Sequence, residues 1–580
     1  MSRFLLAALF TLIIAFWLIA SPYERAEHQV FLVGEILLPG GETAEAVYIH
    51  DGRIAAIGSR ADMLEIAPWG ADRIDLDGGT LTAGLIEPHT HPLAAALLGA
   101  AVDVSGITYS RREDMMAALR EAAAQSGPSP WVIAFGWDPA MIRGLEPPTL
   151  AELDALAPDR PLVILTQMMH EAFVNTAALQ AANIHAATPD PLGGRFERDV
   201  DGNPTGRIIE VSAIRVLMEA APEAPDAALS WLLFGTLNEY ARSGYTTIGV
   251  ASLVGRARDP LALFAEVSQA RNAPLNSVLY TAPDRAERAR DMWSTVDQQR
   301  AISRHAGIKF WMDGSPYVGG AALAQPYARS PFTEEVIELP EGWHGELLTD
   351  QNTARQLIRN AEVQGLQVAI HAQGEDAIDA ILNAIEVEST GEIAHRLEHL
   401  ALITPEQIAR AETLDVSLGF FIDHIRYYGH MLPDLVGDDR TDRYMPVRSA
   451  LEGASTVTLH ADSPATPINA MRVFQTAVER ISRASGIVVA ADQRVTRQQA
   501  LDMMTIHAAR QLGIDDETGS IEIGKRADFT WLSANPLTAE DLVHVEVRGT
   551  WISGRRADTR SWSRPALAHL VGAILAVVTG

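Results

Sequence analysis

The segment GLIEPHTH, residues Gly84 to His91, decides the predicted fold because it joins an apolar strand to two histidines. Successive side chains of a strand alternate in direction, so His89 and His91 point to the same face. A His-x-His pair is weak evidence by itself, since polar residues at a strand end are often solvated. The rest of the chain must show whether other polar residues occupy equivalent strand ends.

Eight apolar, β-branched runs alternate with helical patterns such as TARQLIRNAEVQG along the body of the chain. This alternation is typical of parallel α/β structure. We therefore predict an α/β fold, a (β/α)8 TIM-type barrel over residues 81–512. The expected barrel strands are residues 81–87, 246–252, 276–281, 307–313, 367–372, 394–400, 416–421 and 456–462.

The first two of these runs are separated by about 140 residues, which is too long for one βα connection. The intervening chain contains two further strand-like runs, WVIAFGWD and PLVILTQMMH. We therefore predict an insertion at about residues 100–235, between barrel strands 1 and 2.

Short β-type runs with hairpin turns occur near both ends of the chain. They predict one small β-sandwich domain built from residues 28–80 and residues 513–560. An uncharged run of 17 residues, Phe4 to Ala20, follows Arg3 and fits a signal peptide or an N-terminal hydrophobic helix that anchors residues 1–24 in a membrane. We favour the uncleaved anchor, with an exported body in the periplasm or outside the cell. The apolar tail, residues 561–580, fits a docked surface helix or a contact with a membrane surface.

Composition excludes several classes of protein. The 580 residues are 47% hydrophobic and 21% charged, which rules out a disordered chain. A formal net charge of -28 disfavours nucleic acid as a partner. The chain has no cysteine, so any metal must be held by nitrogen and oxygen ligands. No glycine-rich dinucleotide fingerprint follows a strand, which disfavours a redox enzyme.

Further polar residues end the later predicted strands: His371, His399 and Asp462. Active sites of such barrels lie at the C-terminal ends of the strands, so these residues are expected to converge with His89 and His91. Lys309 alternates with Trp311 and Asp313 in GIKFWMDGS and is expected inside the barrel. Pairing with Asp313 is the alternative explanation for Lys309.

This pattern resembles the amidohydrolase superfamily, whose members have HxH after strand 1, a strand-4 lysine that can be carboxylated, single histidines after strands 5 and 6, and an aspartate after strand 8. More narrowly it resembles amidohydrolase family 3, which contains N-substituted formamide deformylase-like metal-dependent hydrolases. The similar segments include DGRIAAIG, TAGLIEPHTH, HAQGEDAID, HADSP and GSIEIGKRADFTWL, and the likeness covers roughly residues 30 to 555.

The resemblance implies one or two divalent metal ions. His89, His91, carboxylated Lys309 and Asp462 would hold one ion, and Lys309, His371 and His399 the other. Zn²⁺ suits such ligands. His460 shares a face with Asp462 but stays outside the predicted ligand set.

The implied reaction is hydrolysis of a non-peptide C–N bond in a small-molecule amide, such as an N-acyl, N-formyl or cyclic amide, by metal-activated hydroxide with Asp462 as general base. The resemblance also implies substrate contacts from Trp137, His170 and Glu210 in the insertion. An ester or lactone hydrolase, and a non-catalytic binding or regulatory protein, remain alternatives. After strand 7 the chain reads SLGFFIDHIRYYGH where many relatives have a Gln-Pro pattern, so we expect a different pocket wall there. The oligomeric state stays open.

Overall fold

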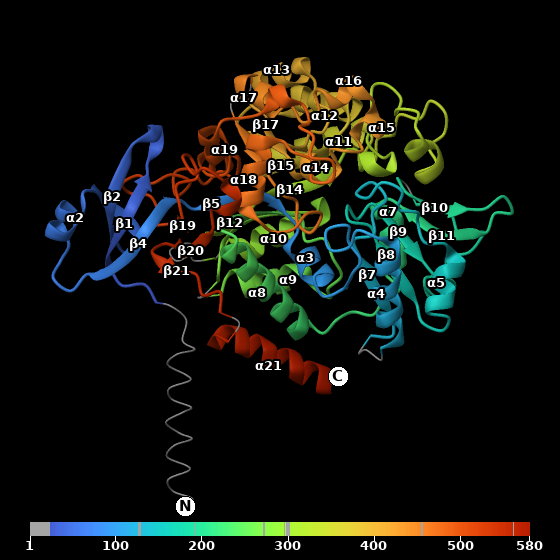
Figure 1. Ribbon diagram of the computed structural model, residues 1–580, viewed down its shortest axis with the longest axis horizontal. Helices are drawn as coiled ribbons and strands as arrows, with labels where there is room; N and C mark the ends of the chain where they lie inside the picture. The colour runs from blue at the N-terminus through green and yellow to red at the C-terminus, as the bar shows by residue number, and fades with distance from the viewer. Residues whose placement is uncertain are drawn as a thin grey trace, which may run out of the picture.

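The centre of the molecule is an eight-stranded parallel sheet that curves into a barrel (Figure 1). The computed structural model describes residues 24–579, apart from residues 126–128, 192, 271–272, 295, 297–301, 454–455 and 561. The barrel strands are, in hydrogen-bonded order, β5 (Leu85–Thr90), β12 (Tyr245–Ala251), β13 (Asn276–Thr281), β14 (Ser303–Trp311), β15 (Gln367–Ala372), β16 (Arg396–His399), β17 (Ser417–Phe420) and β18 (Val457–Leu459). The predicted eight-stranded parallel barrel is confirmed.

The two outermost strands, β5 and β18, come together and nearly close the barrel. The backbone N–H of Ala461 donates to the Glu87 carboxylate at 3.1 Å, and the N–H of His91 donates to the carbonyl of Ser463 at 3.0 Å. Most strand residues are buried, as expected when helices cover the outside of a parallel barrel and side chains fill its interior. The sequence pattern of apolar runs therefore reflects burial on both faces.

Helices surround the barrel (Figure 1). Capping boxes begin two of them, at Thr404 with Gln407 and at Thr496 with Gln499, which satisfies the free N–H groups of a first helical turn. The helices are α3 (Pro92–Leu98), α8 (Asp226–Arg242), α9 (Pro260–Ser268), α10 (Ala286–Trp293), α11 (Gln351–Val363), α12 (Glu375–Glu388), α13 (Pro405–Thr413), α14 (Asp423–Tyr428), α15 (Leu432–Val436), α16 (Asp438–Thr441), α17 (Val447–Gly453), α18 (Ala470–Glu479), α19 (Arg497–Met503) and α20 (Ile506–Gln511).

The chain between β5 and β12 forms a second sheet beside the barrel (Figure 1). Its strands are, in order, β10 (Arg195–Arg198), β11 (Pro204–Ile209), β9 (Glu171–Val174), β8 (Leu162–Leu165), β7 (Val132–Phe135) and β6 (Val102–Asp103). Helices α4 (Arg112–Ala124), α5 (Leu150–Leu156), α6 (Thr176–Ala181) and α7 (Val211–Met218) accompany it. This segment is where the sequence predicted an insertion.

A third sheet, which we call the chain-end sheet, joins strands from both ends of the chain (Figure 1). Its order is β21 (Arg555–Arg556), β20 (Val547–Ile552), β19 (Phe529–Leu532), β4 (Asp72–Ala83), β1 (His28–Leu37), β2 (Thr43–His50) and β3 (Arg53–Gly58); α2 (Arg60–Ile66) follows β3. These seven strands form one hydrogen-bonded series, and the two-layer packing of a sandwich stays a prediction.

The predicted first barrel strand, residues 81–87, is divided in the structure. Residues 81–83 belong to β4 in the chain-end sheet, and the barrel strand β5 begins at Leu85. Gly84 lies between them, and a side chain there would collide with Thr246. Glycine is therefore required where the chain passes from one sheet to the other, because the Thr246 side chain packs directly against its backbone.

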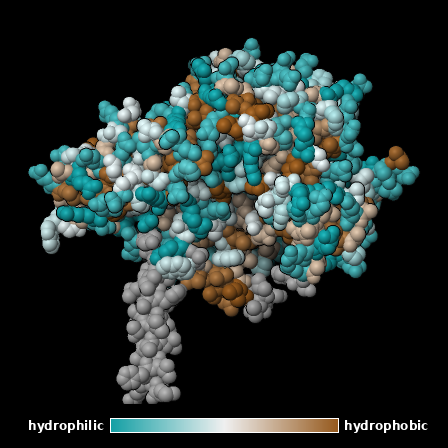
Figure 2. Space-filling view, viewed as in Figure 1, coloured by the Kyte–Doolittle hydropathy of each residue, from teal (hydrophilic) through white to brown (hydrophobic). Residues whose placement is uncertain are grey.

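The C-terminal helix α21 (Arg564–Thr579) lies along α8 (Figure 1). His569 stacks on Phe234 with the ring centres 5.0 Å apart. Val571, Ile574 and Leu575 face outward, and an apolar patch is visible over this helix (Figure 2). The docked helix that the sequence offered as one interpretation of this tail is therefore present.

The predicted localisation needs a correction. Among the described residues, none of the helices combines the length and the apolar character needed to cross a bilayer. This finding contradicts the predicted anchoring in a membrane by an N-terminal helix. The run from Phe4 to Ala20, on which that prediction rested, lies outside the described residues.

Candidate metal centre

The six residues predicted as metal ligands meet at one end of the barrel. They lie at the C-terminal ends of strands β5, β14, β15, β16 and β18 or directly after them, and each is buried. The structure thus brings together His89, His91, Lys309, His371, His399 and Asp462. Residues more than 370 positions apart in the chain become neighbours because parallel strands end at the same rim.

His89, His91 and Asp462 form the tighter half of this cluster. One oxygen of Asp462, Oδ1, lies 3.5 Å from His89 Nε2 and 3.3 Å from His91 Nε2. Ligands about 2.1 Å from a tetrahedral Zn²⁺ are separated from each other by about 3.4 Å. The two distances from Asp462 Oδ1 therefore match the spacing of ligands around one ion, and all three ligand atoms lie within 4.8 Å of one another. His91 Nδ1 lies 3.3 Å from the Ser252 carbonyl, a contact that leaves Nε2 as the coordinating nitrogen.

Lys309, His371 and His399 continue the cluster. Lys309 Nζ lies 3.3 Å from His89 Nε2, and His399 Nδ1 lies 3.8 Å from Asp462 Oδ2. The rings of His371 and His399 are centred 4.3 Å apart. In the described part of the chain, His399 Nδ1 and Asp462 Oδ1 are buried without a hydrogen-bond partner. Such groups are costly to bury unless something else satisfies them, and a bound cation would do so.

The protonation states also suit a metal. Burial lowers the pKa values of His89, His371 and His399 well below the usual range, so these rings stay neutral and keep a lone pair. Burial opposes ionisation of Asp462, but contact with His91 and the surrounding positive groups lowers its pKa overall, so it stays a carboxylate. Neutral imidazoles and carboxylates are the ligating forms.

Comparison with known proteins agrees with this geometry. The model of the amidohydrolase family matches residues 72–557. The chain belongs to this family. The N-substituted formamide deformylase of Arthrobacter pascens is 28% identical over 528 residues, which cover 88% of this chain and 94% of that one. Protein LONG AFTER FAR-RED 3 of Arabidopsis thaliana is 26% identical and is covered over 88% of its length, as is this chain.

Solved structures show the same fold. A metal-dependent hydrolase from Pyrococcus horikoshii superposes with a TM-score of 0.69 at 22% identity, over 89% of this chain and 99% of the other. The resemblance to the amidohydrolases that the sequence motifs indicated is thus confirmed, and the chain is an enzyme of this family.

Glu398 lies beside His89, on the side of the ring away from the other predicted ligands of this amidohydrolase. Its Oε2 lies 3.0 Å from His89 Nδ1, the nitrogen that faces away from Asp462. Its other oxygen accepts a hydrogen bond from the Arg396 guanidinium, and all three side chains are buried. A carboxylate at the outer nitrogen of a ligating histidine fixes the ring and its tautomer. Sequence reasoning missed Glu398, although a carboxylate within the predicted barrel strand at residues 394–400 was an available signal.

We predict that Glu398→Gln will weaken metal binding by roughly 10- to 100-fold without removing a ligand. The amide is nearly the same size but lacks the negative charge that lies 3.0 Å from His89 Nδ1. Competition with a chelator measures the metal affinity. Glu388→Gln is the matched control, because Glu388 is another mostly buried carboxylate paired with arginines, but on α12. Equal affinity in Glu398→Gln and wild type would remove the assigned role.

The Asp313 carboxylate binds backbone N–H groups and is not the partner of the Lys309 side chain. Its carboxylate accepts N–H groups from Ala322, Gln373 and Gly374 at 3.0, 3.0 and 2.9 Å. These bonds join the loop after β14 to the loop after β15. Lys309 instead faces His89 and the ring of Trp311.

The insertion brings His170 and Glu210 to the barrel mouth. His170 Nδ1 lies 2.6 Å from a Glu210 oxygen, and the His170 ring is centred 5.9 Å from that of His371. Burial lowers the pKa of His170, but the Glu210 carboxylate outweighs it and the net shift is upward. Gly314 and Gly320 make room for this carboxylate, since a side chain at either position would overlap it.

Trp137 has a different environment. It is fully buried in the apolar core of the insertion, with Val104, Met115 and Leu119, and Arg112 lies over its ring. The next residue, Asp138, accepts a hydrogen bond from Tyr428 at 2.8 Å. The insertion therefore contacts α14, the helix after β17, through Asp138. Trp137, the preceding residue, packs in the core of the insertion.

The segment after β17, where the sequence departs from the Gln-Pro pattern, includes helix α14 and forms an aromatic wall. His424 is buried among Phe421, Tyr317 and Tyr428, with ring centres 4.2, 5.0 and 5.8 Å from its own. Its Nδ1 lies 3.2 Å from the Tyr444 hydroxyl, whereas its Nε2 has no hydrogen-bond partner in the described residues. Sequence reasoning missed His424 as a site residue.

Proposed function

We propose that this amidohydrolase is a metal-dependent hydrolase that cleaves a non-peptide carbon–nitrogen bond in a small-molecule amide, such as an N-acyl, N-formyl or cyclic amide. The observation that carries the proposal is the buried Asp462 carboxylate held between His89 and His91 at ion-ligand spacing. The deformylase similarity over nearly the whole chain supports the C–N bond as the target.

The donor set fits one or two divalent ions, with Zn²⁺ as the best match for imidazole and carboxylate ligands. His89, His91 and Asp462 would hold one ion, and His371 and His399 the other, with Lys309 between them. When bound, such ions lower the pKa of a coordinated water and polarise the scissile carbonyl.

Asp462 would be the general base. As a carboxylate it can take a proton from the attacking water and later pass it to the departing nitrogen. The low pKa of Asp462 favours the form that accepts a proton. Its Oδ2 faces His399 while Oδ1 faces the His89–His91 pair, so the base lies between the two halves of the cluster.

Lys309 would bridge the halves as a carbamate. Burial lowers the pKa of Lys309 to about 8, which leaves a fraction of the amine neutral near pH 7.5. Only the neutral amine can attack carbon dioxide to form a carbamate, with loss of a proton. The product replaces a buried cation by a carboxylate-like group, which two nearby divalent ions would favour.

The insertion would supply substrate contacts. His170, held by Glu210, lies at the edge of the His371 side of the cluster, where an N–H donor can hold a substrate oxygen or the leaving group. Trp137 is fully buried and would not contact substrate itself. It would act indirectly, by fixing the position of the neighbouring Asp138. His424 Nε2, which has no hydrogen-bond partner in the described residues, would add one polar group to the aromatic wall at α14.

The test is metal analysis followed by a substrate screen on the full-length protein. Purified protein should contain one or two divalent ions per chain, lose activity to a chelator and regain it with Zn²⁺. The screen pairs each N-formyl, N-acyl or cyclic amide with its ester or lactone counterpart. Amide turnover that disappears on metal removal supports the proposal. Turnover of the esters alone would replace it, and a folded protein that binds no metal would contradict it.

A further inference from the structure

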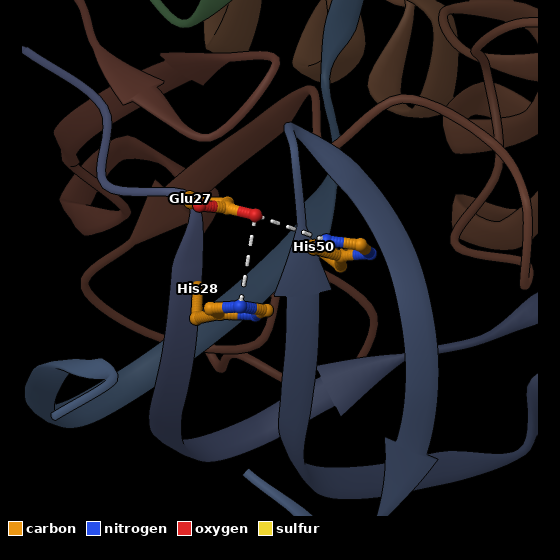
Figure 3. Close-up of side chains that lie close together, drawn as sticks. All are labelled: Glu27, His28 and His50. Atoms are coloured by element: carbon orange, nitrogen blue, oxygen red, sulfur yellow. Dashed lines mark ion pairs between the residues drawn. The ribbon is translucent and has the colours of Figure 1, made fainter. Parts of the chain in front are cut away.

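A cluster of two histidines and a glutamate, Glu27, His28 and His50, lies on the chain-end sheet (Figure 3). We call it the strand-end cluster. His28 begins β1, His50 ends β2, and the two are directly opposite in the antiparallel register. Directly opposed residues place their side chains on one face about 5 Å apart. The Glu27 carbonyl accepts the N–H of Asp51 at 2.7 Å, which fixes Glu27 beside both rings.

Three ligand atoms of this cluster lie within 4.8 Å of one another. The two imidazole rings are stacked 4.7 Å apart and nearly parallel, at 7°. His28 Nε2 and His50 Nε2 lie 3.9 and 3.6 Å from the same Glu27 oxygen (Figure 3). These distances are too long for hydrogen bonds, which end near 3.2 Å. They are only slightly longer than the roughly 3.4 Å between ligands of a tetrahedral zinc ion.

The surroundings prepare His28 for coordination. Its Nδ1 lies 2.8 Å from the Tyr48 hydroxyl, and the two rings are stacked. When Nδ1–H donates to that oxygen, Nε2 presents its lone pair toward Glu27, the arrangement found behind ligating histidines. The side chains of Glu27 and His50 are 72% and 54% exposed, so an ion can enter from solvent and keep water in its remaining positions.

Charge favours a cation at this place. Arg25, two residues before Glu27, is paired with Asp51 at 2.5 Å, so its positive charge is already compensated. The chain as a whole carries a formal charge of -28, which raises the local concentration of cations.

We propose that the strand-end cluster is a second metal site, for Zn²⁺ or Cu²⁺, separate from the barrel centre. Two imidazoles and one carboxylate are ligands that these borderline ions accept, with Cu²⁺ bound more tightly than Zn²⁺. Two of its three ligands, Glu27 and His50, are exposed, and this makes it the weaker site of the two. An ion there joins the entry of β1 to the end of β2, and binding to the folded state alone stabilises the protein.

The test counts bound Zn²⁺ in the full-length protein by equilibrium dialysis against a range of free Zn²⁺. We expect His50→Asn to bind about one ion fewer per chain than wild type at saturation. The matched control is His544→Asn, because His544 is also exposed and lies 3.7 Å from the Asp541 carboxylate, without a second histidine. The control should bind as many ions as wild type. Amide hydrolysis should be equal in all three proteins, which separates this site from the barrel centre.

A second variant and a second signal guard against a general effect of substitution. Tyr48→Phe keeps all three ligands and should weaken the site by roughly 10-fold without changing the number of ions bound. Cu²⁺ added to protein whose barrel centre is already filled with Zn²⁺ should give an electron paramagnetic resonance signal with couplings to two imidazole nitrogens, and His50→Asn should lose one of these couplings. The same number of Zn²⁺ ions and the same Cu²⁺ signal in His50→Asn and wild type would overturn the proposal, as would an equal loss in His544→Asn.

Discussion

Asp462→Asn should lower kcat by roughly 10²- to 10⁴-fold while the protein keeps most of its metal. Asparagine has nearly the same shape and still offers a carbonyl oxygen toward His89 and His91, but it cannot accept and return a proton. One oxygen of this buried carboxylate lies 3.5 Å from His89 Nε2 and 3.3 Å from His91 Nε2. Measuring kcat together with metal per chain distinguishes loss of the base from loss of the ion.

The matched control is Asp434→Asn, which makes the same chemical change on α15, where the carboxylate pairs with Arg143. Its kcat should equal that of wild type. Wild-type turnover in Asp462→Asn would show that another group moves the proton. Complete loss of metal in that variant would mean that Asp462 acts first as a ligand, and the comparison would then have to be made at saturating Zn²⁺.

The convergence of the six proposed ligands was predictable because it depends on two local rules. Alternation along a strand sets the direction of His89 and His91, and the common rim of a parallel barrel brings later strand ends to the same place. His399 and Asp462 followed from that rule even though both have backbone φ angles in the left-handed region, 77° and 50°. Their location depended on the strand end alone and not on the detailed turn.

The supporting residues could not be predicted in the same way, because they depend on packing between distant segments. Glu398 lies next to His399 in sequence, yet its partner is His89, from the first barrel strand. His424 acquires its aromatic surroundings only when α14 packs against Tyr317, more than 100 residues earlier. The space that the Glu210 carboxylate occupies likewise depends on two glycines, Gly314 and Gly320, in the loop after β14. Local hydrophobic patterns contain no information on such contacts.

The two ends of the chain show the same limit. Hairpin signals correctly marked β strands near both termini, but the pairing of β4 with β1 in parallel and with β19 antiparallel is a long-range choice. The first barrel strand was predicted as one run with the end of β4, because apolar periodicity does not register the change of sheet at Gly84.

Lys309→Ala should remove the bridge between the two halves of the centre, so metal content falls to one ion or less per chain and kcat falls by at least about 10²-fold. The alanine leaves a buried space where the carbamate oxygens would lie. Acetate supplies a small carboxylate for that space, so added acetate should restore part of the metal and of the activity. Recovery by acetate and not by chloride would point to the missing oxygens instead of a general loss of structure.

The chain offers an unusually clean control for this experiment, because Lys309 and Lys525 are its only lysines. Lys525 pairs with Glu522 at 3.1 Å and is not among the residues that meet at the barrel mouth. Protein prepared with ¹³C-labelled bicarbonate and metal should therefore show a single carbamate carbon signal by NMR. The signal should persist in Lys525→Arg and vanish in Lys309→Ala. A fully active, metal-loaded wild type without that signal would show that Lys309 works as an amine, and the bridging role would be withdrawn.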